Sequence, residues 1–141
     1  MKLVLFLFAS ALGAATLDLP RATVVVRPGD LPPAEKTAAA VLVEELERRT
    51  GIRLPITSTW PADGLAIAIT GAPAASWGRT VPAAPSRPEG FRLRAEDRAI
   101  WIAGSDARGA LYGVGHLLRQ VRWAKGTLEL DTPLDVSTSP A

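Results

Sequence analysis

The amino-acid sequence predicts an α/β (α+β) domain in which two helices cover a mixed sheet. Short apolar and β-branched runs alternate with two longer segments of helical period. The first of these segments connects two strand signals, and a crossover of that length allows parallel pairing. Later in the chain, two apolar runs flank a turn, which is typical of an antiparallel hairpin. The expected order of elements is β-α-β-β-β-β-α-β.

The strands expected in the first half of the chain are short and apolar. The run ATVVVRPGD is β-branched and ends at Pro28-Gly29, and LPITSTW is a weaker strand signal. The run LAIAIT alternates large and small side chains, which places Leu65, Ile67 and Ile69 on one strongly apolar face. We therefore expect three strands before residue 71.

The first helix is expected at residues 33–50. Pro33 suits its first turn, and Gly51 suits the position just after its end. Its apolar stripe, at helical spacing, consists of Ala38, Val41, Leu42 and Leu46. Its solvated side carries two i,i+4 pairs, Glu44–Arg48 and Glu45–Arg49. One apolar stripe predicts that the helix covers a sheet on one side.

The second half begins with a long loop. Residues 71–90 contain four prolines in a run without period, GAPAASWGRTVPAAPSRPEG, and a loop of this length is either functional or poorly ordered. The runs FRLRA and AIWIA, separated by a turn, predict the hairpin. The second helix follows at residues 105–121, and TLELD predicts a last strand with Leu128 and Leu130 on its inner face.

The second helix contains three glycines, although glycine costs a helix roughly 1 kcal/mol relative to alanine. Gly109 and Gly113 share one stripe, next to the apolar stripe of this helix. We interpret them as a packing device that lets another backbone approach closely, and Gly115 lies on a different stripe with Arg108 and Tyr112.

Composition excludes several classes of function. Sixteen basic residues nearly cancel fourteen acidic ones and are interspersed with them, whereas a nucleic-acid-binding domain shows a clustered basic excess. Cysteine is absent, so disulfides and thiolate metal sites are excluded. We expect no nucleic-acid partner.

The N-terminal segment MKLVLFLFASALGAA is typical of a secretory signal. Lys2 precedes an apolar run from Leu3 to Phe8, and small residues follow it. The run is shorter than the roughly 20 residues that cross a bilayer, which argues against an uncleaved anchor. We expect a signal peptide at residues 1–15 with cleavage after Ala15, a secreted or periplasmic product, and no membrane contact after cleavage.

Motifs for cofactor binding and nucleophilic catalysis do not fit. The glycine spacing of GALYGVGHL differs from G-x-G-x-x-G and lies within helical periodicity. A triad of Ser105, Asp106 and His116 would extend over about 15 Å of helix at 1.5 Å per residue. Ser105 or Asp106 is better interpreted as the helix N-cap, and His116 as a hydrogen-bonded packing residue. A lone histidine without cysteine is a poor start for a metal site.

Charged side chains give no catalytic constellation either. The first helix carries Glu44, Glu45 and Glu47 on its solvated side, and Asp63 is interpreted as a turn residue. The hairpin arginines could meet an anionic sugar, but an exposed strand face is the simpler interpretation for Arg92, Arg94 and Arg98. The sequence therefore predicts no catalytic, cofactor-binding or metal-binding residue and no cofactor.

The segments AEKTAAAVLVEELERRTGIRLPI and PEGFRLRAEDRAIWIAGSDARGALYGVGHLLRQV resemble the N-terminal non-catalytic α/β domain of certain glycoside hydrolases. This domain occurs in bacterial-type β-hexosaminidases of family 20 and α-glucuronidases of family 67. The resemblance covers roughly residues 21–135, and its most specific part is DARGALYG after the hairpin.

The resemblance implies a zincin-like accessory domain, without zinc because H-E-x-x-H is absent, that precedes a (β/α)8 catalytic barrel. It implies an accessory domain at residues 16–135 and the start of a linker to a missing barrel at 136–141. A barrel takes about 250 residues. We therefore expect a fragment or stand-alone version of the domain, inactive alone and associated with glycosidase activity through a barrel partner.

Two functions remain open. The chain is either the accessory domain of a secreted carbohydrate-degrading hydrolase or a stand-alone exported carbohydrate-binding protein. In the second case, a polysaccharide is the partner, and loop 71–90 with Trp60 or Trp77 forms a sugar-stacking surface. Such a surface needs exposed, coplanar rings, whereas Trp101, within the hairpin, is expected in the core.

Overall fold

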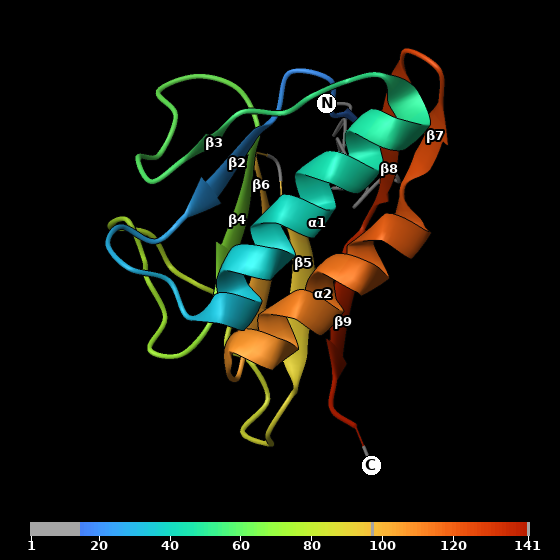
Figure 1. Ribbon diagram of the computed structural model, residues 1–141. Coiled ribbons are helices and arrows are strands. Elements are labelled where there is room, and N and C mark those ends of the chain that lie inside the picture. The colour runs from blue at the N-terminus through green and yellow to red at the C-terminus, as the bar shows by residue number, and fades with distance from the viewer. Residues whose placement is uncertain (1–14, 97, 141) are drawn as a thin grey trace, which may run out of the picture.

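The computed structural model describes residues 15–96 and 98–140 (Figure 1). Its elements are β1 (Ala15–Asp18), β2 (Thr23–Val26), α1 (Pro33–Thr50), β3 (Ile56–Thr57), β4 (Ala66–Thr70), β5 (Phe91–Glu96), β6 (Ala99–Gly104), α2 (Ala107–Gln120), β7 (Arg122–Ala124), β8 (Thr127–Thr132) and β9 (Leu134–Thr138). The signal-peptide prediction falls on residues 1–15, of which 1–14 lie outside the described residues. Neither helix is long and apolar enough to cross a bilayer, in the ranges described.

The strands form two sheets rather than the one sheet expected. A six-stranded sheet has the order β3-β2-β4-β6-β5-β9, in which β3, β2, β4 and β6 pair in parallel and β5 pairs antiparallel with both neighbours. A smaller antiparallel sheet has the order β1-β8-β7. The mixed α/β class with two helices is confirmed.

Three strands were missing from the expected order of elements: β1, β7 and β9. Strands β1 and β7 have four and three residues, too few to show an apolar alternation. Strand β9 does alternate, with Leu134 and Val136 packed against the core, but only over five residues. Strand β9 pairs with β5 and carries the large sheet to Thr138, three residues past the domain end expected at residue 135.

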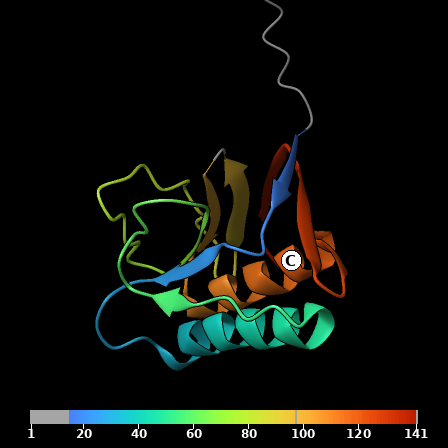
Figure 2. The same cartoon turned by 90° about the horizontal axis from the view of Figure 1, so that it is seen from above.

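Both helices lie on the same face of the large sheet (Figure 2). Alternate residues of the strands point toward them, and the resulting core includes Val24, Val26, Ile67, Ile69, Leu93, Ile100, Ile102, Leu42, Leu46, Val114 and Leu117. The intervening residues point to the other face, where Val25, Ala66, Ala68, Ala99 and Trp101 form a second, smaller core. Loops rather than helices cover this second face (Figure 2).

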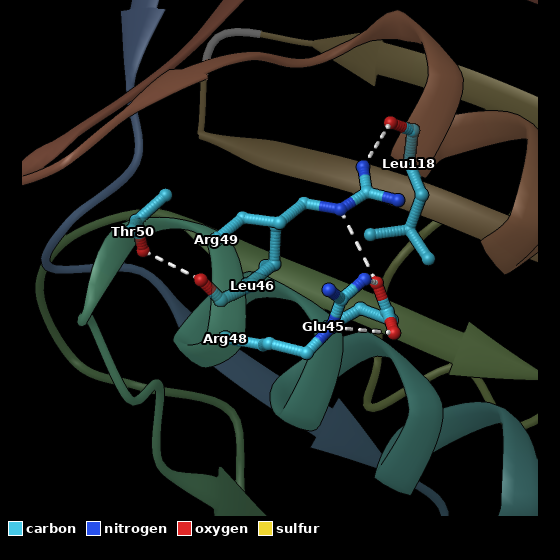
Figure 3. A network of polar contacts seen from close by, with 6 residues as sticks. All are labelled: Glu45, Leu46, Arg48, Arg49, Thr50 and Leu118. Atoms are coloured by element: carbon cyan, nitrogen blue, oxygen red, sulfur yellow. Dashed lines mark hydrogen bonds and ion pairs between the residues drawn. The ribbon is translucent and has the colours of Figure 1, made fainter.

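The C-terminal turn of α1 is joined to α2 by one arginine (Figure 3). Arg49 donates to the carbonyl oxygen of Leu118 at 3.3 Å and to Glu45 at 3.2 Å, and its guanidinium lies 5.0 Å from the ring centre of Trp123. The Leu118 carbonyl belongs to the last turn of α2, where backbone acceptors lack an intrahelical donor. Arg48 also pairs with Glu45, at 2.8 Å, rather than with Glu44 as expected.

We expect Arg49→Met to lower the free energy of unfolding by about 1–2 kcal/mol, because a charge-assisted hydrogen bond and a favourable charge near the C-terminus of α2 are lost. Urea unfolding measures the change. Arg48→Met is the matched control and should change stability little. The side chain of Arg48 is 69% exposed, and among the described residues its ion pair is with Glu45. Equal losses for the two variants would contradict the bridging role of Arg49.

The glycines of α2 differ in their surroundings. A Cβ added at Gly109 would lie 2.0 Å from the carbonyl oxygen of Gly90, and one added at Gly113 would lie 2.6 Å from the Cγ2 of Ile102. These two glycines therefore allow the helix to approach β5 and β6 closely, as the sequence predicted. A Cβ at Gly115 would meet only the end of the Arg119 side chain, at 3.8 Å, so the described fold does not require glycine there.

Candidate functional site

The residues considered for a triad take part in structural contacts. Asp106 caps α2 by accepting from the backbone N–H of Gly109 at 2.7 Å, and it also accepts from the N–H of Glu89 at 2.9 Å. The hydroxyl of Ser105 donates to the carbonyl oxygen of Arg87 at 2.6 Å. Of the two N-cap candidates, Asp106 is the cap. The triad is not supported by these contacts.

His116 is a packing residue on α2. Its ring lies 5.6 Å from that of Phe91, and its Nε2 is 3.4 Å from the side-chain nitrogen of Gln120. Burial, and to a smaller extent the positive charge of Arg119, lowers the pKa of His116 below its usual value. The imidazole is therefore mainly neutral at pH 7.

Two of the three candidate carboxylates on the solvated side of α1 are engaged with arginines of the same region, whereas Glu44 is exposed and is in none of the described ion pairs. Glu45 pairs with Arg48 and Arg49, and Glu47 pairs with Arg53 at 2.5 Å. Asp63 lies in a bend before Gly64, whose φ of 85° is left-handed, which agrees with the interpretation as a turn residue. Within residues 15–96 and 98–140, no group of three histidine or acidic side chains is placed to hold a metal ion.

The hairpin arginines lie on the sheet face away from the helices or in the turn. Arg92 forms a two-pronged pair with Asp135 on β9, at 2.9 Å for each contact. Arg94 pairs through its Nε with Glu96 at 3.2 Å. Arg98 is exposed at the turn. The exposed strand face was expected, but the pair between Arg92 and Asp135 crosses from β5 to β9 and required the unpredicted strand.

Three tryptophans gather on this face. The ring centres of Trp60, Trp77 and Trp101 lie 5.2–6.2 Å apart, and their planes are tilted by 30–49°. Trp101 is 1% exposed, as expected for a core residue. We call these residues the tryptophan cluster. Because the rings pack on one another and are not coplanar, the expected flat stacking surface at Trp60 and Trp77 is not formed.

A cavity of about 440 Å³ opens at the edge of the tryptophan cluster. We call it the arginine pocket, and its defining residues are Trp60, Arg79, Thr80, Arg94, Glu96 and Trp101. The guanidinium of Arg79 lies over the Trp60 ring, 4.2 Å from its centre. Sequence analysis did not single out Arg79, because its contact with Trp60 joins two loops and leaves no periodic signal.

A second cavity, also about 440 Å³, lies along the exposed side of α2. We call it the α2 groove, and its defining residues are Phe91, Leu111, Tyr112, Gly115 and Arg119. Tyr112 is 46% exposed. The groove thus combines apolar side chains with the glycine that the described fold does not require.

A buried ion pair near the start of α1 was also missed by the sequence analysis. Glu35 is 0% exposed and pairs with Arg27, which donates in addition to the carbonyl oxygen of Pro73 at 3.1 Å. A Cβ at Gly71 would lie 2.9 Å from the Glu35 carboxylate. The pair therefore fixes the start of loop 71–90 against α1. A glutamate in a first helical turn gives no sequence signal of burial, because acidic residues are common there.

Comparison with protein families shows a match over most of the chain. The family model described as glycosyl hydrolase family 20, domain 2, matches residues 10–133. No curated protein sequence matches the chain.

Solved structures with the same fold come from glycoside hydrolases. A family 115 4-O-methyl-α-glucuronidase with specificity for decorated arabinogalactans is 20% identical with a TM-score of 0.68, over 89% of this chain and 18% of that enzyme. A family 20 β-N-acetylhexosaminidase from Streptomyces coelicolor is 19% identical with a TM-score of 0.62, over 90% of this chain and 24% of that enzyme.

A family 20 exo-β-N-acetylglucosaminidase from Vibrio harveyi is 19% identical with a TM-score of 0.60, over 91% of this chain and 17% of that enzyme. The chain therefore spans less than a quarter of each of these three structures. At this level of identity, the likeness shows the fold.

Proposed function

Because the chain belongs to the family of glycosyl hydrolase family 20, domain 2, an accessory domain of glycoside hydrolases, we propose that it serves a secreted carbohydrate-degrading enzyme as a non-catalytic domain. Its partner in this proposal is a catalytic (β/α)8 barrel of hexosaminidase or glucuronidase type. Residues 1–15 direct export, and the domain stabilises or positions the barrel.

The α2 groove carries the proposal. Gly115 costs the helix roughly 1 kcal/mol relative to alanine, yet a Cβ there would make only an ordinary contact with the end of the Arg119 side chain, at 3.8 Å. The neighbouring Tyr112 is exposed, and the half-buried Leu111 adds apolar surface, whereas Phe91 lies buried beneath them. A glycine next to exposed apolar side chains suits the close approach of a second domain, so the groove is the surface at which we place the barrel.

The proposal assigns no catalysis to the chain itself. Glycoside hydrolysis needs two carboxyl groups that flank a scissile bond, usually about 5–10 Å apart. The α1 carboxylates Glu45 and Glu47 are bound by arginines, and Glu35 is fully buried against Arg27. We expect the purified chain to release no product from aryl hexosaminides or glucuronides.

Gly115→Gln tests the groove, because glutamine fills it without adding charge. In the 141-residue chain alone, the melting temperature should stay the same or rise slightly, since glutamine is a better helix former than glycine. In the complete product of the gene, the melting temperature of the catalytic domain should fall by about 2–4 °C, which corresponds to ~1 kcal/mol of lost domain contact. Differential scanning calorimetry measures both.

Thr37→Gln is the matched control, since Thr37 is exposed on α1 outside the groove. This variant should leave both melting temperatures unchanged. A complete gene product that tolerates Gly115→Gln as well as Thr37→Gln would refute the proposed interface. Turnover of an aryl glycoside by the 141-residue chain, lost on substitution of one of its own residues, would refute the non-catalytic role.

A further inference from the structure

The arginine pocket lies on the opposite face of the sheet from the α2 groove. Its floor is formed by the sheet residues Ala99 and Trp101, and its wall by the loop residues Trp60, Arg79 and Thr80. At about 440 Å³ it is within the usual range for small-ligand sites, roughly 300–1,000 Å³. The pocket shares no lining residue with the α2 groove.

Strand register explains why arginine and tryptophan meet in this pocket. Trp101 on β6 pairs with Ala68 on β4 and with Arg94 on β5. The small Ala68 leaves room for the Trp101 ring and for the loop tryptophans that pack on it. On the other side, Arg94 and Glu96 project from the same face of β5, since they are two residues apart.

The charge of the pocket favours an anion. It contains the guanidinium groups of Arg79 and Arg94 and the carboxylate of Glu96, so positive charge is in excess by one among these described side chains. Arg94 is bound to Glu96 through Nε, which leaves the pair of terminal nitrogens outside that contact. Among residues 15–96 and 98–140, no carboxylate pairs with Arg79.

The stacking of Arg79 on Trp60 prepares the guanidinium for such a ligand. The N–H donors of a guanidinium lie in its plane, so a contact through its face with the indole uses none of them. The indole also restricts the side chain to one orientation, which reduces the entropy lost on binding. Arginine in this state recognises a carboxylate through two parallel hydrogen bonds.

We propose that the arginine pocket binds a uronic acid residue of an acidic saccharide. The sugar carboxylate is recognised by the guanidinium groups of Arg79 and Arg94. The hydroxyl of Thr80 and the carboxylate of Glu96 are the partners for ring hydroxyls. The role of this binding, which rests on the function proposed above, is to hold an acidic polysaccharide beside the enzyme to which the domain belongs.

The test compares two ligands that differ at a single position, methyl β-glucuronide and methyl β-glucoside. The 141-residue chain is titrated with each at low ionic strength, and binding is followed by the NMR signals of the tryptophan indole N–H groups. We expect the glucuronide to bind about tenfold more tightly or better, because its carboxylate adds charge-assisted hydrogen bonds. Arg94→Gln and Arg79→Gln should each remove most of this preference.

Arg92→Gln is the matched control, because Arg92 lies two residues from Arg94 on the same strand but is paired with Asp135 outside the pocket. Its glucuronide affinity should equal that of the parent. Equal affinity for glucoside and glucuronide, or no binding of either, would overturn the proposal. An equal loss of glucuronide affinity in Arg92→Gln and Arg94→Gln would also overturn it, because that result indicates nonspecific attraction of an anion. Acetate that binds as tightly as the glucuronide would overturn it too, because the pocket would then be a simple carboxylate site.

Discussion

Gly109→Ala is expected to lower the free energy of unfolding by about 3 kcal/mol, the upper part of the usual range for overpacking. The added methyl group would lie 2.0 Å from the carbonyl oxygen of Gly90 and 3.3 Å from the Cα of Gly104. The same carbonyl accepts the backbone N–H of Ser105 at 2.8 Å, so it can move only if that hydrogen bond is distorted. The gain in helix propensity, up to about 1 kcal/mol, is too small to compensate.

The other two glycines of α2 provide a graded comparison. At Gly113 the added methyl group meets the Cγ2 methyl of Ile102 at 2.6 Å, a longer contact than at Gly109 and with a side chain instead of backbone, so Gly113→Ala should cost less than Gly109→Ala. At Gly115 it makes only an ordinary contact with the end of the Arg119 side chain, at 3.8 Å, and Gly115→Ala should be neutral or stabilising by up to about 1 kcal/mol. Urea unfolding of the three variants measures the order. An equal effect at Gly109 and Gly115 would contradict the close-packing explanation.

The helices were more predictable from sequence than the sheets. Helix α1 begins at Pro33 and ends at Thr50, as its apolar period and flanking residues predicted. Periodicity is local information, since each turn of a helix repeats the pattern. Strand β9 alternates over only five residues, and its pairing partner β5 lies about forty residues earlier in the chain. Long-range pairing of an exposed edge strand has little sequence signal.

The functional surfaces were predicted only where helical geometry defines them. The packing role of Gly109 and Gly113 followed from their shared stripe, because residues four apart lie on one helix face. The contact of Arg79 with Trp60 joins two irregular loops, whose paths no period determines. For the same reason, the sequence could name Trp60 and Trp77 as candidates but not the tilt of their rings.

Asp106→Ala is expected to lower the free energy of unfolding by about 2–3 kcal/mol. Loss of an aspartate N-cap typically costs about 1 kcal/mol. A second loss arises because Asp106 also accepts from the N–H of Glu89, a residue with a left-handed φ of 61°. Without that acceptor a partly buried donor is left unpaired, which costs about 1–3 kcal/mol. Asp106 thus connects the end of loop 71–90 to the start of α2.

Asp106→Asn separates the two contributions and gives a pH test. Asparagine remains a good N-cap, so this variant should lose less stability than Asp106→Ala.

The N–H of Glu89, followed by that of Gly109, lowers the pKa of Asp106 below its usual value of 3.8. The stabilising effect of the charged carboxylate is therefore complete above pH 3.8 and is lost as the pH falls through the lower pKa of the folded state. The stability difference between the parent and Asp106→Asn, measured by urea unfolding, should accordingly shrink as the pH falls below about 3.8. A difference that is constant from pH 7 to pH 3 would show that the charge of Asp106 contributes nothing to holding Glu89.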